Sequence, residues 1–125
     1  MRSLKGLVKK KDFSDVYTKG GSVVDRFMVL YCLAKNQPYT RFGFSVSKKL
    51  GQAVTRNRYK RILREICRTN SDRINEGYDC IIIARPRIVG EAYRTIEKSF
   101  IRLAGKAKIL GKEMDAGEVT GNSTN

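Results

Sequence analysis

Apolar residues near the start of the chain recur at a helical spacing. Residues 9–19 place Phe13, Val16 and Tyr17 at positions i, i+3 and i+4, which predicts a short helix with one apolar stripe. The Gly20–Gly21 pair that follows is typical of a helix end. Other segments must therefore supply the core against which this stripe packs.

Three later segments have the apolar patterns of strands. Residues 23–33 are apolar at odd and even positions alike, which predicts a strand covered on both faces, with a break near Asp25 left open. After a turn, residues 41–47 alternate large apolar side chains with Gly and Ser, so this strand has one apolar face and one small polar face. Residues 78–84 form a buried strand that ends before Pro86.

Helical spacing returns in two longer segments. Residues 55–70 repeat apolar side chains every three or four positions, and Thr55 is a candidate N-cap. Residues 91–109 also place apolar side chains on one side. The resulting order is α-β-β-α-β-α, which predicts an α+β fold with helices packed on a mixed sheet.

The length and the apolar content suit one domain. The chain has 125 residues, of which 41% are hydrophobic, and a chain of this size can bury one core. Residues 111–125 lack apolar periodicity and consist mostly of Gly, Thr, Asn and Ser with several acids. We predict a single domain over residues 1–110 and a disordered polar tail over residues 111–125.

The charge of the chain indicates a class of partner. Lys and Arg number 26 against 12 acids, which gives a formal net charge of +14. An excess of this size exceeds what solubility requires and favours a polyanionic partner. The folded part is more basic than the whole chain, because the tail carries three acids and one Lys.

Residues that commonly catalyse reactions or bind metals are sparse. The chain has no His, and Cys32, Cys67 and Cys80 are far apart and set among apolar residues. We therefore predict buried thiols, no metal site and no catalysis by the polypeptide itself. An odd cysteine count without disulfide-like spacing indicates a reducing compartment. With no signal peptide and no run of roughly 20 apolar residues, the expected location is the cytoplasm.

The helix predicted over residues 55–70 separates its cations from its apolar side chains. At about 100° per residue, one narrow stripe holds Asn57, Arg61, Arg64 and Arg68. Glu65 alone interrupts the basic run and lies off this stripe. Arg favours bidentate contact with phosphate. A solvated basic face is the alternative, but the total charge favours nucleic acid.

Aromatic side chains favour RNA over DNA. Phe13, Tyr17 and Tyr31, with the small polar face of the strand over residues 41–47, could form a groove in which unstacked bases lie on rings. Each ring taken singly is more typical of a core residue. The prediction of a stacking surface therefore depends on the rings lying together.

Consecutive motifs in the middle of the chain match a known family. Residues 44–51 read FSVSKKLG, residues 53–61 read AVTRNRYKR, and IIIAR follows at residues 81–85. With Lys10, Asp12 and Phe13 near the start, these motifs resemble the protein subunit of bacterial ribonuclease P over about residues 7–110. Tyr17 stands where that family often has Phe, which keeps an aromatic ring.

The resemblance implies more than periodicity can show. It implies a two-layer α+β sandwich in the order α-β-β-β-α-β-α, with a left-handed βαβ crossover of the ribosomal protein S5 domain 2 type. It also implies a ribonucleoprotein endonuclease, in which the RNA subunit, with Mg²⁺ at its active site, removes the 5′ leader of precursor tRNA. The implied partners are the catalytic RNA and precursor tRNA, without a membrane or an obligate protein partner.

The resemblance also assigns residues to two RNA surfaces. The cleft for the 5′ leader takes in Phe13, Val16, Tyr17, Tyr31, Ser45 and Ser47. The surface for the RNA subunit takes in Lys48, Lys49, Arg56, Asn57, Arg58, Lys60, Arg61, Arg64 and Arg68. The last three arginines could serve either surface.

Other functions share part of this pattern. A general basic RNA-binding protein, of the ribosomal or RNA-chaperone type, would have the same charge and fold class but no selectivity for a leader. A stand-alone nuclease would need a general base or clustered carboxylates, which the sequence does not offer. A membrane-surface role is weaker still, because the core requires the apolar face of the basic helix.

Overall fold

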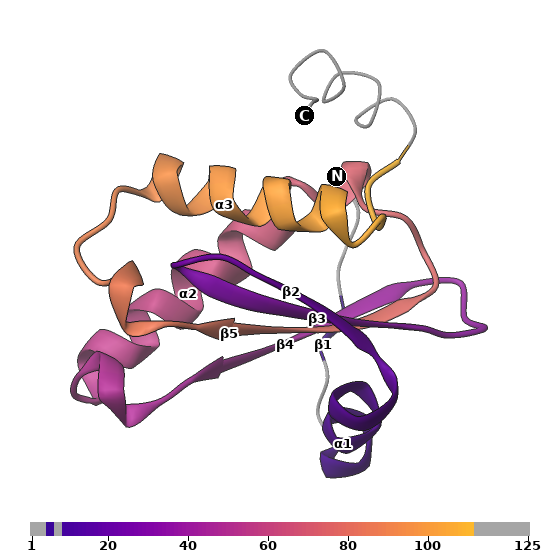
Figure 1. Ribbon diagram of the computed structural model, residues 1–125, viewed down its shortest axis with the longest axis horizontal. Helices are drawn as coiled ribbons and strands as arrows, with labels where there is room; N and C mark the ends of the chain where they lie inside the picture. The colour runs from indigo at the N-terminus through magenta and orange to yellow at the C-terminus, as the bar shows by residue number, and fades with distance from the viewer. Residues whose placement is uncertain (1–4, 7–8, 112–125) are drawn as a thin grey trace.

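The computed structural model describes residues 5–6 and 9–111 (Figure 1). The helices and strands are β1 (Lys5–Gly6), α1 (Lys10–Lys19), β2 (Gly21–Val24), β3 (Met28–Ala34), β4 (Thr40–Val46), α2 (Ala53–Thr69), β5 (Tyr78–Ala84) and α3 (Tyr93–Lys106). Three 3-10 turns join them, namely η1 (Lys48–Leu50), η2 (Ser71–Arg73) and η3 (Pro86–Ile88). Apart from Gly111, the predicted tail lies outside the described residues.

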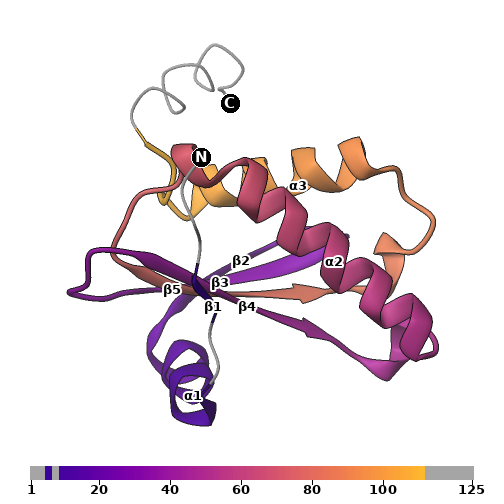
Figure 2. The same ribbon diagram turned by 180° about the vertical axis from the view of Figure 1, so that it is seen from behind.

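The strands form one mixed sheet in the order β1-β4-β5-β3-β2. β5 runs parallel to β4 and antiparallel to β3, so the last strand in the chain lies between two earlier ones. The chain passes from β4 to β5 through α2, and this crossover is left-handed, as the resemblance implies (Figures 1 and 2). α2 and α3 cover one face of the sheet, and α1 lies on the other.

Asp25 marks the break inside the strand predicted over residues 23–33. Its carboxylate accepts hydrogen bonds from the backbone N–H groups of Phe27 and Met28, which forms the turn between β2 and β3. Ser99 and Arg102 of α3 donate to the same carboxylate. The three strands between the first two helices are therefore confirmed, whereas periodicity alone gave two strands there. Neither predicted order contained the short strand β1 before α1.

α2 begins two residues before the predicted start. Gln52 occupies the N-cap position and makes no capping bond with its side chain, so the prediction that Thr55 caps the helix is wrong. The reason lies in Gly51, whose φ of 144° turns the chain from η1 directly into the helix. α3 covers Tyr93–Lys106 and is therefore shorter at both ends than the predicted range of 91–109.

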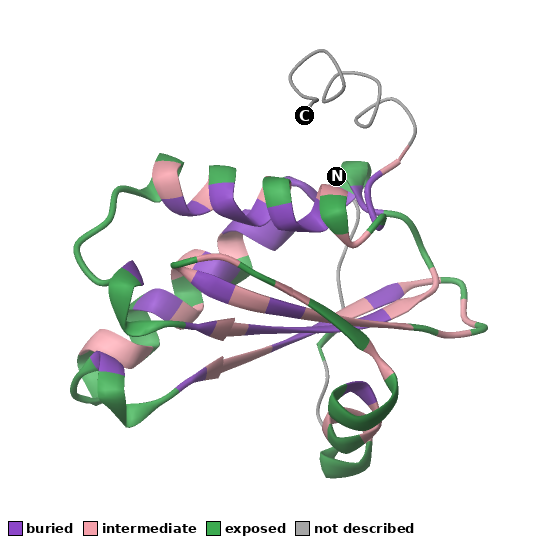
Figure 3. Cartoon of the chain, viewed as in Figure 1, coloured by how far each residue is buried: buried purple, intermediate pink, exposed green. Residues whose placement is uncertain are grey.

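The main core fills the space between the sheet and the pair α2 and α3 (Figure 3). Its largest fully buried side chains include Met28, Leu30, Leu63, Ile66, Ile82, Ile96, Phe100 and Leu103. The rings of Phe42 and Phe100 meet edge to face with centroids 6.0 Å apart. A smaller cluster under α1 has only Val16 and Ile81 fully buried, so α1 covers its face of the sheet incompletely.

An ion-pair network ties α1 to the sheet. Arg41 of β4 donates to both carboxylate oxygens of Asp79 in β5, at 2.8 and 2.6 Å, and reaches Asp12 of α1 at 3.4 Å. Only 1% of the Asp79 side chain is exposed. Burial acts to raise the pKa of Asp79, but hydrogen bonds from Arg41 and Gln37 outweigh it and hold the pKa below its usual value.

Gly20 allows the end of α1 to approach β3 closely. A Cβ at this position would lie 2.7 Å from the carbonyl oxygens of both Val16 and Cys32, and neither backbone atom can rotate away. We expect Gly20→Ala to lower the free energy of unfolding by about 1–3 kcal/mol, as overpacking does. Urea unfolding measures this. The control is Gly21→Ala, where a Cβ meets no atom within 4 Å, and equal losses would contradict the prediction.

Candidate nucleic-acid interface

Alternate residues of the central strands face α1. Ile81 is buried against Val16 of α1. Every second residue of β5, counted from Ile81, lies on the same face of the sheet, together with the residues paired with these in β3 and β4. The register places Tyr31 beside Ile81, and Ser45 beside Ile83. Tyr31, Ser45 and Ile83 are only partly buried. The part of the sheet that α1 leaves uncovered therefore presents aromatic, hydroxyl and aliphatic side chains together.

Two tyrosines form the aromatic part of this face. The rings of Tyr17 and Tyr31 meet edge to face, with centroids 5.1 Å apart and planes at 88°. Tyr17 is 39% exposed. Burial raises the pKa of Tyr17, against a smaller opposing effect of its hydrogen bond with Ser45, so the phenol is neutral at physiological pH. We call the surface formed by Phe13, Tyr17, Tyr31 and Ser45 the α1-side surface.

The other two residues assigned to the leader cleft lie differently. Val16 is fully buried, so it supports the α1-side surface from beneath and presents no atom to a ligand. Ser47 is exposed just beyond the end of β4, and its hydroxyl accepts a hydrogen bond from the backbone N–H of Lys49 at the start of η1. Ile83 was missed in the prediction, although the alternation of β5 around Ile81 is a signal for it.

α2 carries most of the residues assigned to the RNA subunit. Its buried side chains are Tyr59, Leu63, Ile66 and Cys67, and its exposed ones include Asn57, Arg58, Arg61, Arg64 and Arg68. The basic side chains of α2 therefore lie apart from its core residues, as predicted. Arg56 and Lys60 are half-buried, and Arg56 donates a hydrogen bond from Nε to the carbonyl oxygen of Gly51. We call the exposed basic side of α2, continued by Lys48 and Lys49 of η1, the α2 basic face.

The charges on the α2 basic face are not equally available. Nε of Arg68 donates to Oε1 of Glu65 at 3.0 Å, and this pair lowers the pKa of Glu65. The sequence placed Glu65 off the stripe, yet the two side chains meet because residues i and i+3 are neighbours on a helix. The guanidinium of Arg64 lies 5.8 Å from the centroid of the Phe44 ring. Neither Arg58 nor Arg61 makes an ion pair with another described residue.

The two surfaces lie in different layers of the domain. Figure 2 shows α1 on one side of the sheet and α2 on the other. Lys48 and Lys49 are exposed in η1, where the chain passes from β4 to α2. A single molecule can therefore contact one polyanion through α2 while a second ligand occupies the α1-side surface.

The cysteines and acids show no arrangement for metal chemistry in the part of the chain that the structure describes. There, no group of three or more His, Cys, Asp or Glu side chains could hold a metal ion. Cys67 and Cys80 are buried free thiols and Cys32 is half-buried. The sulfur atoms of Cys32 and Cys80 are 3.3 Å apart, because the two residues are partners in the register of β3 and β5. Among the described residues, no helix is both long and apolar enough to cross a membrane.

Comparison with known proteins finds one family. The family model described as Ribonuclease P matches residues 1–108. The ribonuclease P protein component of Alkaliphilus metalliredigens is 38% identical over 110 residues, which cover 88% of this chain and 99% of that protein. The protein of the same name from Clostridioides difficile is 42% identical over 106 residues, or 84% of this chain and 93% of its own length.

Solved structures give the same result. The Staphylococcus aureus RNase P protein matches with a TM-score of 0.78 and 35% identity, over 87% of this chain and all of that one. The Thermotoga maritima RNase P protein matches with a TM-score of 0.76 and 28% identity, over 86% and 99% of the two chains. The chain therefore belongs to the ribonuclease P protein family, the protein components of the enzyme that processes the 5′ end of tRNA.

Proposed function

We propose that the protein holds two RNAs at once, the 5′ leader of precursor tRNA on the α1-side surface and the catalytic RNA on the α2 basic face. One observation carries the proposal. Partly exposed aromatic rings share a sheet face with Ser45, while arginines without an ion pair to a described residue lie on the opposite layer. A single-stranded leader needs rings for its bases, and a structured RNA needs cations for its phosphates.

Each surface has its own binding chemistry. The edge-to-face pair of Tyr17 and Tyr31 offers ring surface to unstacked bases of any sequence, because every base has a π face. The hydroxyl of Ser45 can bond to phosphate or sugar oxygens beside the rings. On α2, the forked guanidinium groups of Arg58 and Arg61 suit bidentate contact with phosphate. Neutralising charge on both RNAs lowers the repulsion between them, an effect that weakens with salt.

The protein's own residues bind and position RNA. In this proposal the phosphodiester is hydrolysed at the active site of the RNA subunit, and Mg²⁺ supplies metal-ion catalysis there. Among the described residues, no three His, Cys, Asp or Glu side chains lie together where they could hold a metal ion. The proposal therefore assigns no step of the reaction to a metal bound by this chain. The cytoplasm, where precursor tRNA and the catalytic RNA meet, is the proposed location.

The direct test is cleavage of precursor tRNA by a bacterial ribonuclease P RNA at low Mg²⁺, with and without the protein. We expect stimulation that requires both subunits and that is weaker for a substrate with a one-nucleotide leader. Tyr17→Ala should raise KM about tenfold for the long leader, as the loss of one stacked base would, and leave the short-leader substrate unaffected. Unchanged cleavage despite tight RNA binding would overturn the proposal and favour a general RNA-binding protein.

The double variant Arg61→Ala with Arg64→Ala tests the α2 basic face. Both side chains are exposed, so circular dichroism should show an unchanged fold. If each contacts one phosphate, the slope of log affinity for the catalytic RNA against log salt should decrease in magnitude by roughly 1.4 to 1.8. The matched control is Lys98→Ala with Lys106→Ala, which removes the same charge from exposed positions on α3. If the slope decreased equally in the two double variants, RNA binding would depend on the total charge of the protein and not on the α2 basic face.

A further inference from the structure

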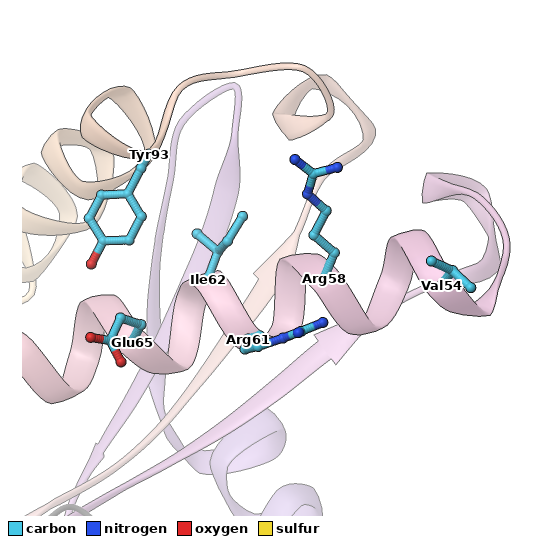
Figure 4. Close-up of a pocket in the computed structure, with 6 residues that line it drawn as sticks. All are labelled: Val54, Arg58, Arg61, Ile62, Glu65 and Tyr93. Atoms are coloured by element: carbon cyan, nitrogen blue, oxygen red, sulfur yellow. The ribbon is translucent and has the colours of Figure 1, made fainter.

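A shallow pocket lies between α2 and the start of α3, where two arginines of the α2 basic face meet residues that the sequence assigned to neither surface (Figure 4). It is lined by Val54, Arg58, Arg61, Ile62, Glu65 and Tyr93. Val54 is 81% exposed and Tyr93 is 40% exposed. Neither belongs to the hydrophobic core. The pocket therefore combines apolar and aromatic surface that the fold leaves uncovered with two guanidinium groups.

The charged groups around the pocket are unevenly placed. Figure 4 shows Arg58 and Arg61 towards the Val54 end, and Glu65 beside Tyr93 at the other end. Arg58 and Arg61 make no ion pair with other described residues, whereas Glu65 is paired with Arg68. A phosphate would be attracted to the Val54 end and repelled by the carboxylate at the Tyr93 end. An uncharged flat group would suit the Tyr93 end.

We propose that this pocket binds one unstacked nucleobase of the catalytic RNA, with the base against Tyr93 and Ile62 and its neighbouring phosphates on Arg58 and Arg61. The inference rests on the proposed function of the α2 basic face and adds a site for a base to a surface assigned only to phosphates. An aromatic ring beside Arg is a common platform for extruded bases in RNA recognition. Apolar side chains at the rim exclude water from the stacked base.

The pocket and the α1-side surface lie on opposite sides of the sheet. A base bound at Tyr93 would therefore strengthen the binding of the catalytic RNA without sensing the leader. Loss of the pocket should change cleavage of long-leader and short-leader substrates by the same factor. This separates the pocket from the proposed leader site.

The first experiment measures the affinity of the catalytic RNA for variants of Tyr93. Tyr93→Leu keeps apolar bulk but removes the aromatic ring, and we expect it to weaken binding about tenfold. Tyr93→Phe keeps the ring and should bind within about twofold of the wild type. Val54→Ala should weaken binding, whereas Val89→Ala, at an exposed position outside the pocket, should not. Equal affinities of Tyr93→Leu and wild type would overturn the inference.

A second measurement reports stacking directly. The chain has no Trp, so Tyr93→Trp introduces a single Trp that can be excited at wavelengths where Tyr does not absorb, and a stacked base should quench its fluorescence when the catalytic RNA is added. An unquenched Trp in a variant that binds RNA normally would also overturn the inference. If Tyr93→Leu changed sedimentation of the free protein but not RNA binding, a second copy of the chain would be the occupant. Failure of wild-type protein to bind the catalytic RNA would instead refute the proposed function itself.

Discussion

Alanine in place of Phe100 should lower the free energy of unfolding by about 4 kcal/mol, within the range for a fully buried Phe. Phe100 is completely buried on α3 and packs edge to face on Phe42 of β4. The substitution removes this ring contact and leaves a cavity between α3 and the sheet. Urea unfolding followed by circular dichroism measures the loss.

Phe44→Ala is the matched control for this prediction. Phe44 stacks on Phe42 with centroids 6.4 Å apart, but its ring is partly exposed at the β4 side of the core and lies near Arg64. Water can fill the space that its removal leaves, so the loss should be less than half of that for Phe100. Similar losses at the two positions would mean that α3 is not held by the interior packing described above.

Arg41→Met should cost about 3 kcal/mol, because it leaves the buried carboxylate of Asp79 without its main partner. The value is at the lower end for a broken buried pair, since Lys35 and Gln37 still contact Asp79. The contact with Asp12 is lost as well, which loosens α1. Unfolding by urea measures the cost. Asp12→Asn, which breaks only the outer contact, should cost less than half as much.

The loss caused by Arg41→Met should shrink as the pH falls from 7 to 4. In the wild type, the pKa of Asp79 is held below the unfolded value of about 3.9, so the ion pair stabilises the fold above that pH and is lost as acid protonates the carboxyl group. Without Arg41, only Gln37 and Lys35 oppose the effect of burial on the pKa of Asp79. We therefore expect the carboxyl group of the variant to accept a proton at a higher pH, which relieves the cost of the unpaired charge. Phe100→Ala involves no titrating group, and its loss should stay constant over the same range.

A helix or strand could be predicted from the sequence where its apolar residues follow a simple pattern along the chain. α1, α2 and β4 place apolar residues at a regular period, and β5 is a mostly apolar run. Each appears within a few residues of its predicted range. The break at Asp25 has a weaker local signal, because its carboxylate is held in part by Ser99, far along the chain. The hand of the crossover has no local signal, so only the resemblance implied it. The position of β5 between β3 and β4 has no local signal either, and it was not predicted.

The candidate site was predictable to the same extent. Helix geometry alone places the arginines of α2 opposite its buried residues, and the structure has them there. On α1, the neighbours Val16 and Tyr17 differ by about 100° in direction, which buries the first and exposes the second. The sequence could not distinguish them without knowing how α1 docks. Tyr93 was missed because it lines a pocket with residues of α2 only through the packing of α3 beside α2.

The central position of β5 also determines when the sheet can assemble during synthesis. Within the part of the chain that the structure describes, β3 hydrogen-bonds only to β2 and β5, and β4 only to β1 and β5, so no ladder joins these two halves before residues 78–84 are made. Until then the nascent chain holds apolar strands without their central neighbour, a state prone to aggregation. Most of the domain is therefore synthesised before it can fold, and completion of one late strand joins two separate strand pairs into a single five-stranded sheet.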